Sequence, residues 1–396
     1  FLPPVYTDRQ FYESDCSHLV VYVPEETLSL YQRASQWSQY APYMVGYKYD
    51  DIGEWNPDFY TSSDFSHDGE VTVLQTSSSG NGINLVLMGD GFTDLQIENG
   101  SYGNAMQQAA DAFFSEEPYR SFKDLFNVYY VNVVSLTEGY DHPGQSLGTG
   151  FGGGTFVFGN DIKVIDYAKK VLSEDQLDDA LIIVMMNRDA YAGTCYMYDA
   201  PDGDYGRGLS IAYFPTSSDV GTFNGLVSHE AGGHGFAKLA DEYAYEYMGA
   251  ISEQEVYSAH VKETSGWWKN IDFIGDPNQV KWNVFIDKER YASEDIGCFE
   301  GAFTYWTGVW RPTENSIMRY NTGGFNAPSR YAIWYRMNKL AYGESWNGTC
   351  EDFVSYDAVN RTPAAVVGRK AKNYVEKQLP PLAPPVIVGH SWRDEL

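Results

Sequence analysis

Short apolar runs alternate with amphipathic stretches from residue 83 to residue 215. Runs of strand length, either apolar throughout or alternating with polar residues, predict four strands: INLVLMGD (83–90), NVYYVNVVSL (127–136), ALIIVMMN (180–187) and LSIAYFP (209–215). Helical periodicity predicts two helices between them: NAMQQAADAFFSEE (104–117) and DIKVIDYAKKVLSED (161–175). This order of elements predicts an α/β fold of the α+β kind, with helices packed on a layered sheet.

Small polar residues in TSSSGNG (76–82) predict the clearest domain boundary. Upstream of it, HLVVYVPE (18–25) and GEVTVLQT (69–76) predict strands with turn-rich segments between them. We therefore predict three parts of the chain: a small β-rich N-terminal domain (1–80), a main domain (81–345) and a C-terminal extension (346–396).

Both ends of the chain have informative sequence features. Phe1 stands where a complete chain begins with Met, and either a removed export signal or a trimmed start explains this. We expect the first, which predicts a secreted or cell-surface protein. Near the other end, the prolines of QLPPLAPPVIVGHSW (378–392) predict an extended segment that either lies over the domain or acts as a spacer.

Composition excludes several classes of function. The chain has 27 basic and 54 acidic residues, a net charge of -27, and nucleic-acid binding requires a basic surface. No apolar run approaches the roughly 18 residues of a membrane-spanning helix. Cys16, Cys195, Cys298 and Cys350 form no C-x-x-C pair, which argues against a cysteine zinc site or a redox motif. One or two disulfides remain open, with undetermined pairing.

The segment SHEAGGHGFAKLADEY (228–243) combines two histidines with neighbouring carboxylates. A catalytic zinc site uses imidazole nitrogens and a carboxylate, and a base removes the proton of the attacking water. His229 and His234 can supply the imidazoles and Glu230 the general base, so we predict a Zn²⁺ site here. The alternative is a helix whose histidines only pack or face solvent.

The spacing of the two histidines departs from the pattern H-E-x-x-H, which puts them at i and i+4 on one helix face. His229 and His234 are at i and i+5, and a regular helix would separate them by about 140° rather than about 40°. A π-bulge would rotate His234 back toward His229. The small residues AGG (231–233) offer little resistance to a widened turn, so we predict such a bulge, with both imidazoles converging on one point.

A third zinc ligand is expected further along the chain, because a catalytic site holds three protein ligands. Asp241 and Glu242 are the next side chains that can coordinate zinc, and successive helical residues point about 100° apart. Asp241 follows His234 by seven positions, nearly two turns, so we predict Asp241 as the ligand and Glu242 as the alternative. Seven helical residues rise about 10.5 Å, so we also expect a bend between Gly235 and Asp241.

Several segments resemble, in order, the bacterial IgA-peptidase family of zinc metallopeptidases. The matching segments are NLVLMGDGFT (84–93), FFSEEPYRSFKDLFNVYYVNVVS (113–135), HEAGGHGFAKLADEY (229–243) and EGAFTYWTGVWRPTENSIMRYN (300–321). The resemblance covers about residues 80–345. It implies a metzincin-like zinc peptidase domain, preceded by a β-rich domain and acting on a protein or peptide substrate.

Two departures from this resemblance concern the zinc site. One residue is inserted between the histidines, and Ala237 stands where a metzincin-like pattern has Gly. A pair at i and i+5 also occurs in the dipeptidyl peptidase III family, where it binds zinc. In metzincins the third ligand follows the second histidine by six positions, which here is Ala240, a residue that cannot coordinate zinc.

A second metzincin feature follows downstream, in NSIMRY (315–320). Metzincins carry a Met-containing turn beneath the zinc, and Ser316, Met318 and Tyr320 match its S-x-M-x-Y form. A single Met-turn is a weak signal because core methionines are common. In this order after the His-Glu segment it supports the resemblance, and Tyr320 becomes the expected donor to the developing oxyanion.

These features predict a zinc-dependent endopeptidase of extracellular proteins, secreted by a bacterium or held at its surface. GLSIAYFP (208–215) is either the edge strand that pairs with an extended substrate or an interior strand. Two alternatives remain: a non-catalytic binding protein or adhesin on a peptidase-like scaffold, and a zinc hydrolase of other substrates. The natural substrate and the oligomeric state are not predicted, since fold resemblance does not transfer specificity.

Overall fold

The computed structural model describes residues 21–34, 37–47, 59–200, 203–361 and 379–395. The chain divides into two compact units, Phe1–Tyr60 and Thr61–Leu396. The predicted boundaries at residues 80 and 345 stay predictions, and Cys16 lies outside the described residues.

The first unit contains a pair of parallel strands. Its described elements are β1 (Val21–Pro24), α1 (Glu25–Arg33), a 3₁₀ helix (Ser38–Tyr43) and β2 (Met44–Tyr47). The strand predicted in HLVVYVPE is confirmed at β1, while residues 18–20 lie outside the described part.

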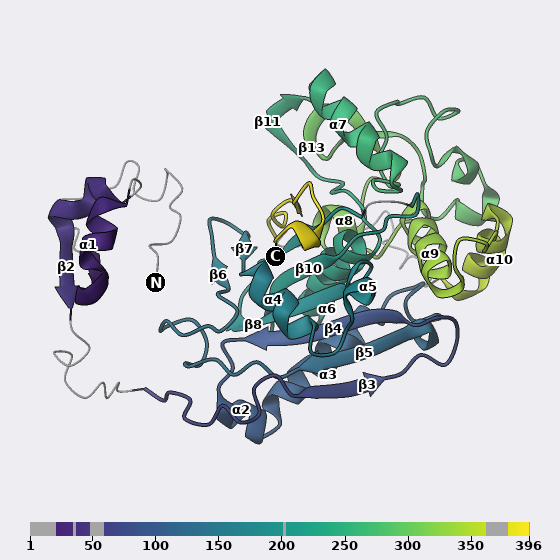
Figure 1. Ribbon diagram of the computed structural model, residues 1–396. Helices are drawn as coiled ribbons and strands as arrows, with labels where there is room; N and C mark the ends of the chain where they lie inside the picture. The colour runs from purple at the N-terminus through teal and green to yellow at the C-terminus, as the bar shows by residue number, and fades with distance from the viewer. Residues whose placement is uncertain (1–20, 35–36, 48–58, 201–202, 362–378, 396) are drawn as a thin grey trace. The chain divides into compact units, whose positions relative to one another are not determined.

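Seven strands of the second unit form one mixed sheet in the order β14-β9-β10-β8-β4-β5-β3 within the described residues (Figure 1). They are β3 (Val71–Gln75), β4 (Ile83–Asp90), β5 (Phe126–Val131), β8 (Leu181–Asp189), β9 (Thr194–Met197), β10 (Ser210–Thr216) and β14 (Val386–Ile387). The four central strands β5, β4, β8 and β10 are parallel, whereas β3 and β9 run antiparallel to their neighbours. The α/β fold predicted from the alternation of elements is confirmed.

β10 corrects one of the two readings of GLSIAYFP. It lies between β8 and β9 and hydrogen-bonds to both, so it is an interior strand and not the edge. Its side chains are buried from Ser210 to Pro215. The interior position explains the continuous apolar run, because a strand covered on both faces needs no polar alternation.

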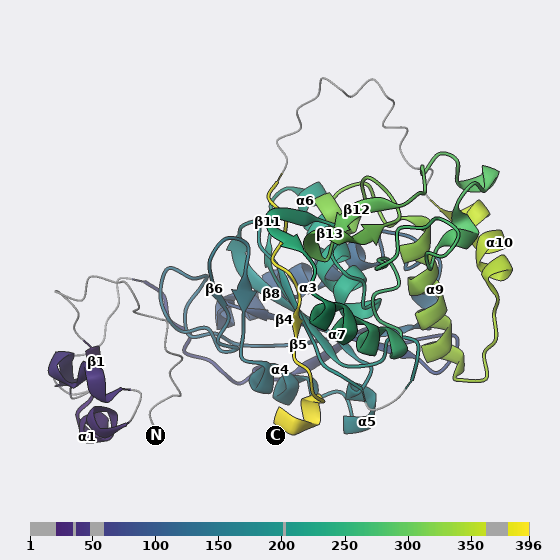
Figure 2. The same cartoon turned by 90° about the horizontal axis from the view of Figure 1, so that it is seen from above.

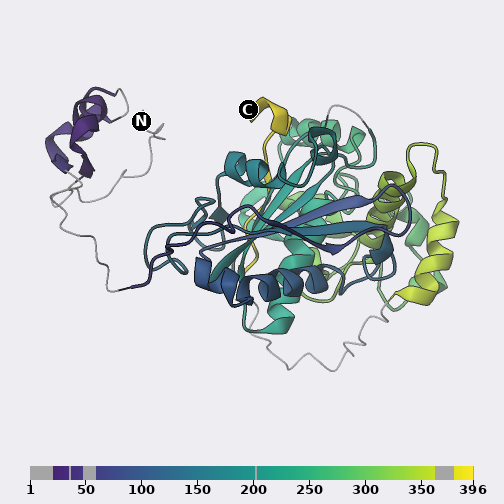
Figure 3. The same cartoon turned by 60° about the horizontal axis from the view of Figure 1, so that its bottom comes forward.

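Alternate side chains of the central strands enter two different hydrophobic cores, as a strand with period two requires. Leu85 and Leu87 pack with α3 (Ser101–Phe113) and with the helix that carries the two histidines. Val86 and Met88 pack on the opposite face with α4 (Asp161–Ala168). Figure 3 shows the sheet between α3 and α4. One face of the sheet therefore packs directly against the helix that carries the His-Glu segment.

The remaining elements are mostly short and surround this sheet. They are α2 (Asp94–Glu98), β6 (Gly150–Phe151), β7 (Val157–Phe158), α5 (Glu174–Leu177), α6 (Val220–Leu226), β11 (Ala244–Ala250), α7 (Glu253–Thr264), β12 (Phe299–Ala302), β13 (Thr304–Arg311), α8 (Ile317–Tyr320), α9 (Ala327–Tyr342) and α10 (Cys350–Asn360). Cys195, Cys298 and Cys350 are free, so no disulfide forms among the described cysteines. No described helix is long and apolar enough to cross a membrane.

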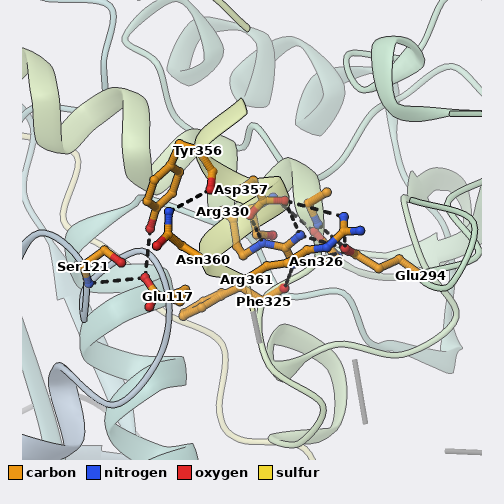
Figure 4. Close-up of polar contacts among 12 residues, drawn as sticks. Glu117, Ser121, Glu294, Phe325, Asn326, Arg330, Tyr356, Asp357, Asn360 and Arg361 are labelled. Atoms are coloured by element: carbon orange, nitrogen blue, oxygen red, sulfur yellow. Dashed lines mark hydrogen bonds and ion pairs between the residues drawn. The ribbon is translucent and has the colours of Figure 1, made fainter. Parts of the chain in front are cut away.

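The buried guanidinium of Arg330 connects α9 and α10 to the segments that contain Glu294 and Phe325. The Arg330 guanidinium donates to Asp357 at 2.7 Å and 2.8 Å, to Glu294 at 2.7 Å and to the carbonyl of Phe325 at 2.6 Å (Figure 4). Only 8% of the Arg330 side chain is exposed. Because Asn326 follows Phe325 and begins α9, this network fixes a loop that also contributes to the site described below.

We predict that Arg330→Met lowers the free energy of unfolding by about 3–5 kcal/mol, because Glu294 and Asp357 lose their main partner while remaining buried. Urea denaturation measures the change. Arg188→Met is the matched control, since Arg188 pairs with Asp141 on the surface and should cost less than about 1 kcal/mol. Equal losses in the two variants would contradict the assignment.

Candidate metal centre

The two histidines lie on a π-helix, Val227–Phe236, which continues directly from α6. Its C-terminal turn is wide: the N–H of Ala237 donates to the carbonyl of Gly232, and that of Leu239 to the carbonyl of Gly233. The imidazole rings of His229 and His234 are consequently neighbours, with centroids 4.8 Å apart. The predicted widening of this helix is confirmed.

Glycine is needed here for space as well as for backbone freedom. A Cβ on Gly233 would lie 2.2 Å from Sδ of Met318, and a Cβ on Gly235 would lie 2.6 Å from Cδ1 of Leu181. Met318 and Leu181 are both buried, Met318 in α8 and Leu181 in β8. The π-helix is therefore clamped between β8 and the methionine turn.

His229, His234 and Asp241 form a buried group with converging ligand atoms. Oδ1 of Asp241 lies 3.2 Å from Nε2 of His229 and 3.2 Å from Nε2 of His234. None of these three atoms completes a hydrogen bond. Burial alone would raise the pKa of Asp241, but the imidazoles of His234 and His229 lower that pKa below its ordinary value. The two imidazoles therefore favour the charged, carboxylate form of Asp241.

Backbone carbonyls orient both imidazole rings. Nδ1 of His229 lies 2.9 Å from the carbonyl of Ile317, and Nδ1 of His234 lies 2.7 Å from that of Leu239. With Nδ1 as the protonated donor, Nε2 keeps a lone pair directed at Asp241. This arrangement is usual for histidines that bind metals, because the second hydrogen bond fixes the tautomer and the ring.

The donor set fits a zinc ion. Two ligands bound tetrahedrally at about 2.05 Å are roughly 3.3 Å apart, close to the two distances of 3.2 Å measured here. All three ligand atoms lie within 4.8 Å of one another. Two imidazole nitrogens and one carboxylate oxygen leave a fourth position for water or substrate.

Asp241 reaches the histidines because the chain bends after the π-helix. Lys238 takes a left-handed conformation with φ of 54°, which ends the helix. Asn270 then fixes the next turn, accepting from the N–H of Ala240 and donating to its carbonyl, each at 2.8 Å. The bend falls between Gly235 and Asp241, where the rise of an unbroken helix made one necessary.

Glu242 faces away from this group and accepts hydrogen bonds from three side chains. Ser316 donates at 2.7 Å, Asn270 at 2.9 Å and Asn326 at 3.0 Å. Burial raises the pKa of Glu242, while these donors oppose the shift. Glu242 therefore connects the Asp241 segment to the Met-turn and to the start of α9, and the alternative that it is the third ligand has no geometric support.

Glu230 is fully buried next to His229. Burial raises the pKa of Glu230 to about 8. The imidazole of His229 opposes this rise in the pKa, while the carboxylate of Asp241 adds to it, and neither carboxylate oxygen of Glu230 completes a hydrogen bond. A Cβ on Gly193 would lie only 2.7 Å from Cγ of Glu230, so the start of β9 presses against this side chain. A buried, unpaired carboxylate with a raised pKa is typical of a general base or acid.

Ser316 and Met318 of the Met-turn are buried, whereas Tyr320 is only partly buried. Met318 is buried under Gly233, and Ser316 is bound to Glu242. Tyr320 is half-buried, with the Arg319 guanidinium 4.5 Å from its ring. Among the described residues its hydroxyl makes no hydrogen bond, and the structure does not join it to the histidines and Asp241.

Tyr243 is a residue of this region to which the sequence analysis gave no role. Its hydroxyl donates to the carbonyl of Leu382 at 2.7 Å. Burial and then the carboxylate of Asp241 raise the pKa of Tyr243 well above its ordinary value, so the hydroxyl stays protonated. Its place directly after the acidic pair in LADEY was the available signal, but the partner, 139 residues away, was not predictable.

A family model described as IgA Peptidase M64 matches residues 71–291. The match covers more than half of the 396 residues and includes the π-helix and Asp241. No curated protein matches the chain.

We predict that Gly233→Ala weakens zinc binding at least tenfold, because the new methyl group and Met318 cannot both keep their places under the π-helix. Calorimetric zinc titration measures the affinity. Gly153→Ala, where a Cβ meets nothing within 4 Å, should have no effect. Adding Met318→Ala to Gly233→Ala should restore part of the affinity; unaltered affinity in Gly233→Ala would show that the clamp does not position the ligands.

Proposed function

The chain belongs to the IgA peptidase M64 family and is a peptidase, and from this we propose that it is a zinc-dependent endopeptidase of extracellular proteins. One observation carries the zinc dependence: three buried, unpartnered ligand atoms converge next to an unpartnered carboxylate. Proteins rarely leave such atoms without partners, because each costs free energy when buried. A metal ion bound by His229, His234 and Asp241 supplies the missing partner.

Zinc held there would acidify a water molecule and polarise the scissile carbonyl group. Glu230 accepts the proton of the attacking water on a carboxylate oxygen and then delivers it to the leaving amine. Tyr320 is our proposed donor to the developing oxyanion, on the pattern of Ser316, Met318 and Tyr320 alone.

The extracellular substrate is supported by the family description, which refers to an immunoglobulin. We propose secretion or display at the cell surface for the same reason. Specificity within extracellular proteins is set by contacts outside the metal group, so the family name does not select one substrate for this chain.

Replacing Asp241 and Glu242 by their amides separates the proposed ligand from its neighbour. Asp241→Asn should lower zinc affinity by a factor of ten or more, because the amide neutralises the only carboxylate in the group. Glu242→Gln should retain one zinc per chain, with a lower melting temperature from the disturbed bonds to Ser316 and Asn326. Elemental analysis by mass spectrometry counts the metal, and zinc lost only from Glu242→Gln would reverse the assignment.

Glu230→Gln tests the base separately from the metal. The variant should keep its zinc while hydrolysis of fluorescently labelled casein falls by a factor of about 10² or more. Asp219→Asn is the control, an exposed carboxylate that caps α6. Full activity in Glu230→Gln would exclude Glu230 as the base, whereas zinc binding without cleavage of casein or of a peptide library by any variant would favour the binding-protein alternative.

A further inference from the structure

A C-terminal strap, residues 379–388, contacts Tyr243 and Thr155 near the metal group. Figure 2 shows it in yellow, running extended from the side of β11 toward α4 and α5. Its last part, β14, pairs in parallel with β9, and the N–H of Val388 donates to the carbonyl of Met197 at 3.0 Å. Leu382 is 1% exposed, so the strap is packed against the protein and is not a spacer.

Of two residues that bind the strap, one is close to Asp241 and the other contacts a neighbour of Glu230. Tyr243, next to Asp241, donates to the carbonyl of Leu382 at 2.7 Å. Thr155 donates through Oγ1 to the carbonyl of Pro381 at 3.1 Å, and its own carbonyl accepts from Gly193, which presses on Glu230. One residue thus connects the strap to Asp241, and two residues, Thr155 and Gly193, connect it to Glu230.

The groups beneath the strap are sealed from solvent. His229 is 1% exposed, Glu230 and His234 0%, and Asp241 2%. A peptidase must bring the scissile bond within hydrogen-bond reach of its base. With the site as described, no peptide can do so, and a covering segment has to leave first.

The strap is bound as an extended peptide is bound in general. Its carbonyls and N–H groups make the described hydrogen bonds, and it adds a strand to the outer edge of β9, a mode of recognition that depends little on side chains. Prolines at 380, 381, 384 and 385 favour the extended form before binding, which reduces the entropy lost on docking.

The strap is anchored beyond the covered site. Trp392 is buried in the hydrophobic core that contains Val86, Met88 and α4, and its Nε1 donates to Asp178 at 2.8 Å. Arg393 pairs with Glu174, Asp175 and Asp178. Residues 379–388 can therefore leave the site while the end of the chain stays in place.

We propose that the outer edge of β9, with Thr155 and Tyr243, lines a peptide-binding channel, and that the strap is its resident occupant. The channel takes extended, apolar peptides through their main chain, and the strap must leave before such a peptide reaches Glu230. This deepens the proposed function, on which the identity of the groups beneath the strap rests.

Replacing residues 380–388 by a Gly-Ser sequence of equal length removes the occupant and keeps the Trp392 anchor. Fluorescein-labelled LPPLAPPVIV, the sequence of residues 379–388, should bind this variant at least tenfold more tightly than the unaltered protein, measured by fluorescence anisotropy. Hydrolysis of labelled casein should rise tenfold or more. Unaltered proteins that cleave casein as fast as the variant would overturn the proposal and leave the peptidase assignment intact.

A smaller change guards against misfolding of that variant. Val388→Pro removes the N–H that bonds to Met197, and should raise casein hydrolysis about fivefold, the worth of one backbone hydrogen bond. Val388→Ala is the matched control, because it keeps this N–H and removes only side-chain atoms, and it should change the rate less than Val388→Pro. Equal rates in both variants and the unaltered protein would also overturn the proposal.

A different result identifies failure of the proposed function. If no variant cleaves casein although zinc is bound, the assignment of this site as a peptidase site is wrong. The peptide-binding channel is then tested by peptide binding alone. A pool of unrelated extended peptides should then displace labelled LPPLAPPVIV from the Gly-Ser variant. Failure of that pool to displace it would overturn the channel as well.

Discussion

The wide turn between His229 and His234 determines where the other groups of the site lie. With α-helical geometry the two side chains would point about 140° apart, and no single ion could reach both. The π-helix brings their Nε2 atoms to the same carboxylate oxygen, 3.2 Å from each. The π-helix therefore compensates for the inserted residue between the two histidines.

The wide turn persists because the surrounding structure holds it in place. The lack of a side chain at Gly233 leaves room for Met318, and the carbonyls of Ile317 and Leu239 accept hydrogen bonds from the imidazole rings. Glu242 then joins the Asp241 segment to Ser316 and Asn326. Hydrogen bonds thus connect the histidines and the Asp241 segment to the methionine turn and to the start of α9.

Much of the fold was predictable because it depends on local pattern. The buried runs that became β4, β8 and β10 are apolar on both faces, as central parallel strands require. The order of strands was not predictable from periodicity, since a run of apolar residues does not encode its neighbours. For this reason GLSIAYFP could not be placed, and β9 with β14 was found only in the structure.

In the site, as in the fold, some features depend on neighbouring residues and others on residues that are distant in the sequence. The histidine pair and its widened turn follow from six consecutive residues, so the sequence sufficed. The spacing predicted a bend between Gly235 and Asp241, but not its position at Lys238, a non-glycine residue with positive φ, or the contacts with Asn270 that follow it. Tyr243 was missed because its hydroxyl binds Leu382, and the strap that covers the site is distant in sequence.

Anomalous X-ray scattering at the zinc absorption edge, from crystals of the zinc-loaded protein, would locate the metal and its ligands together. We expect one strong peak about 2.0–2.2 Å from Nε2 of His229, Nε2 of His234 and a carboxylate oxygen of Asp241. A peak on Glu242, or one bound by a single histidine with the other turned to a different helix face, would contradict it.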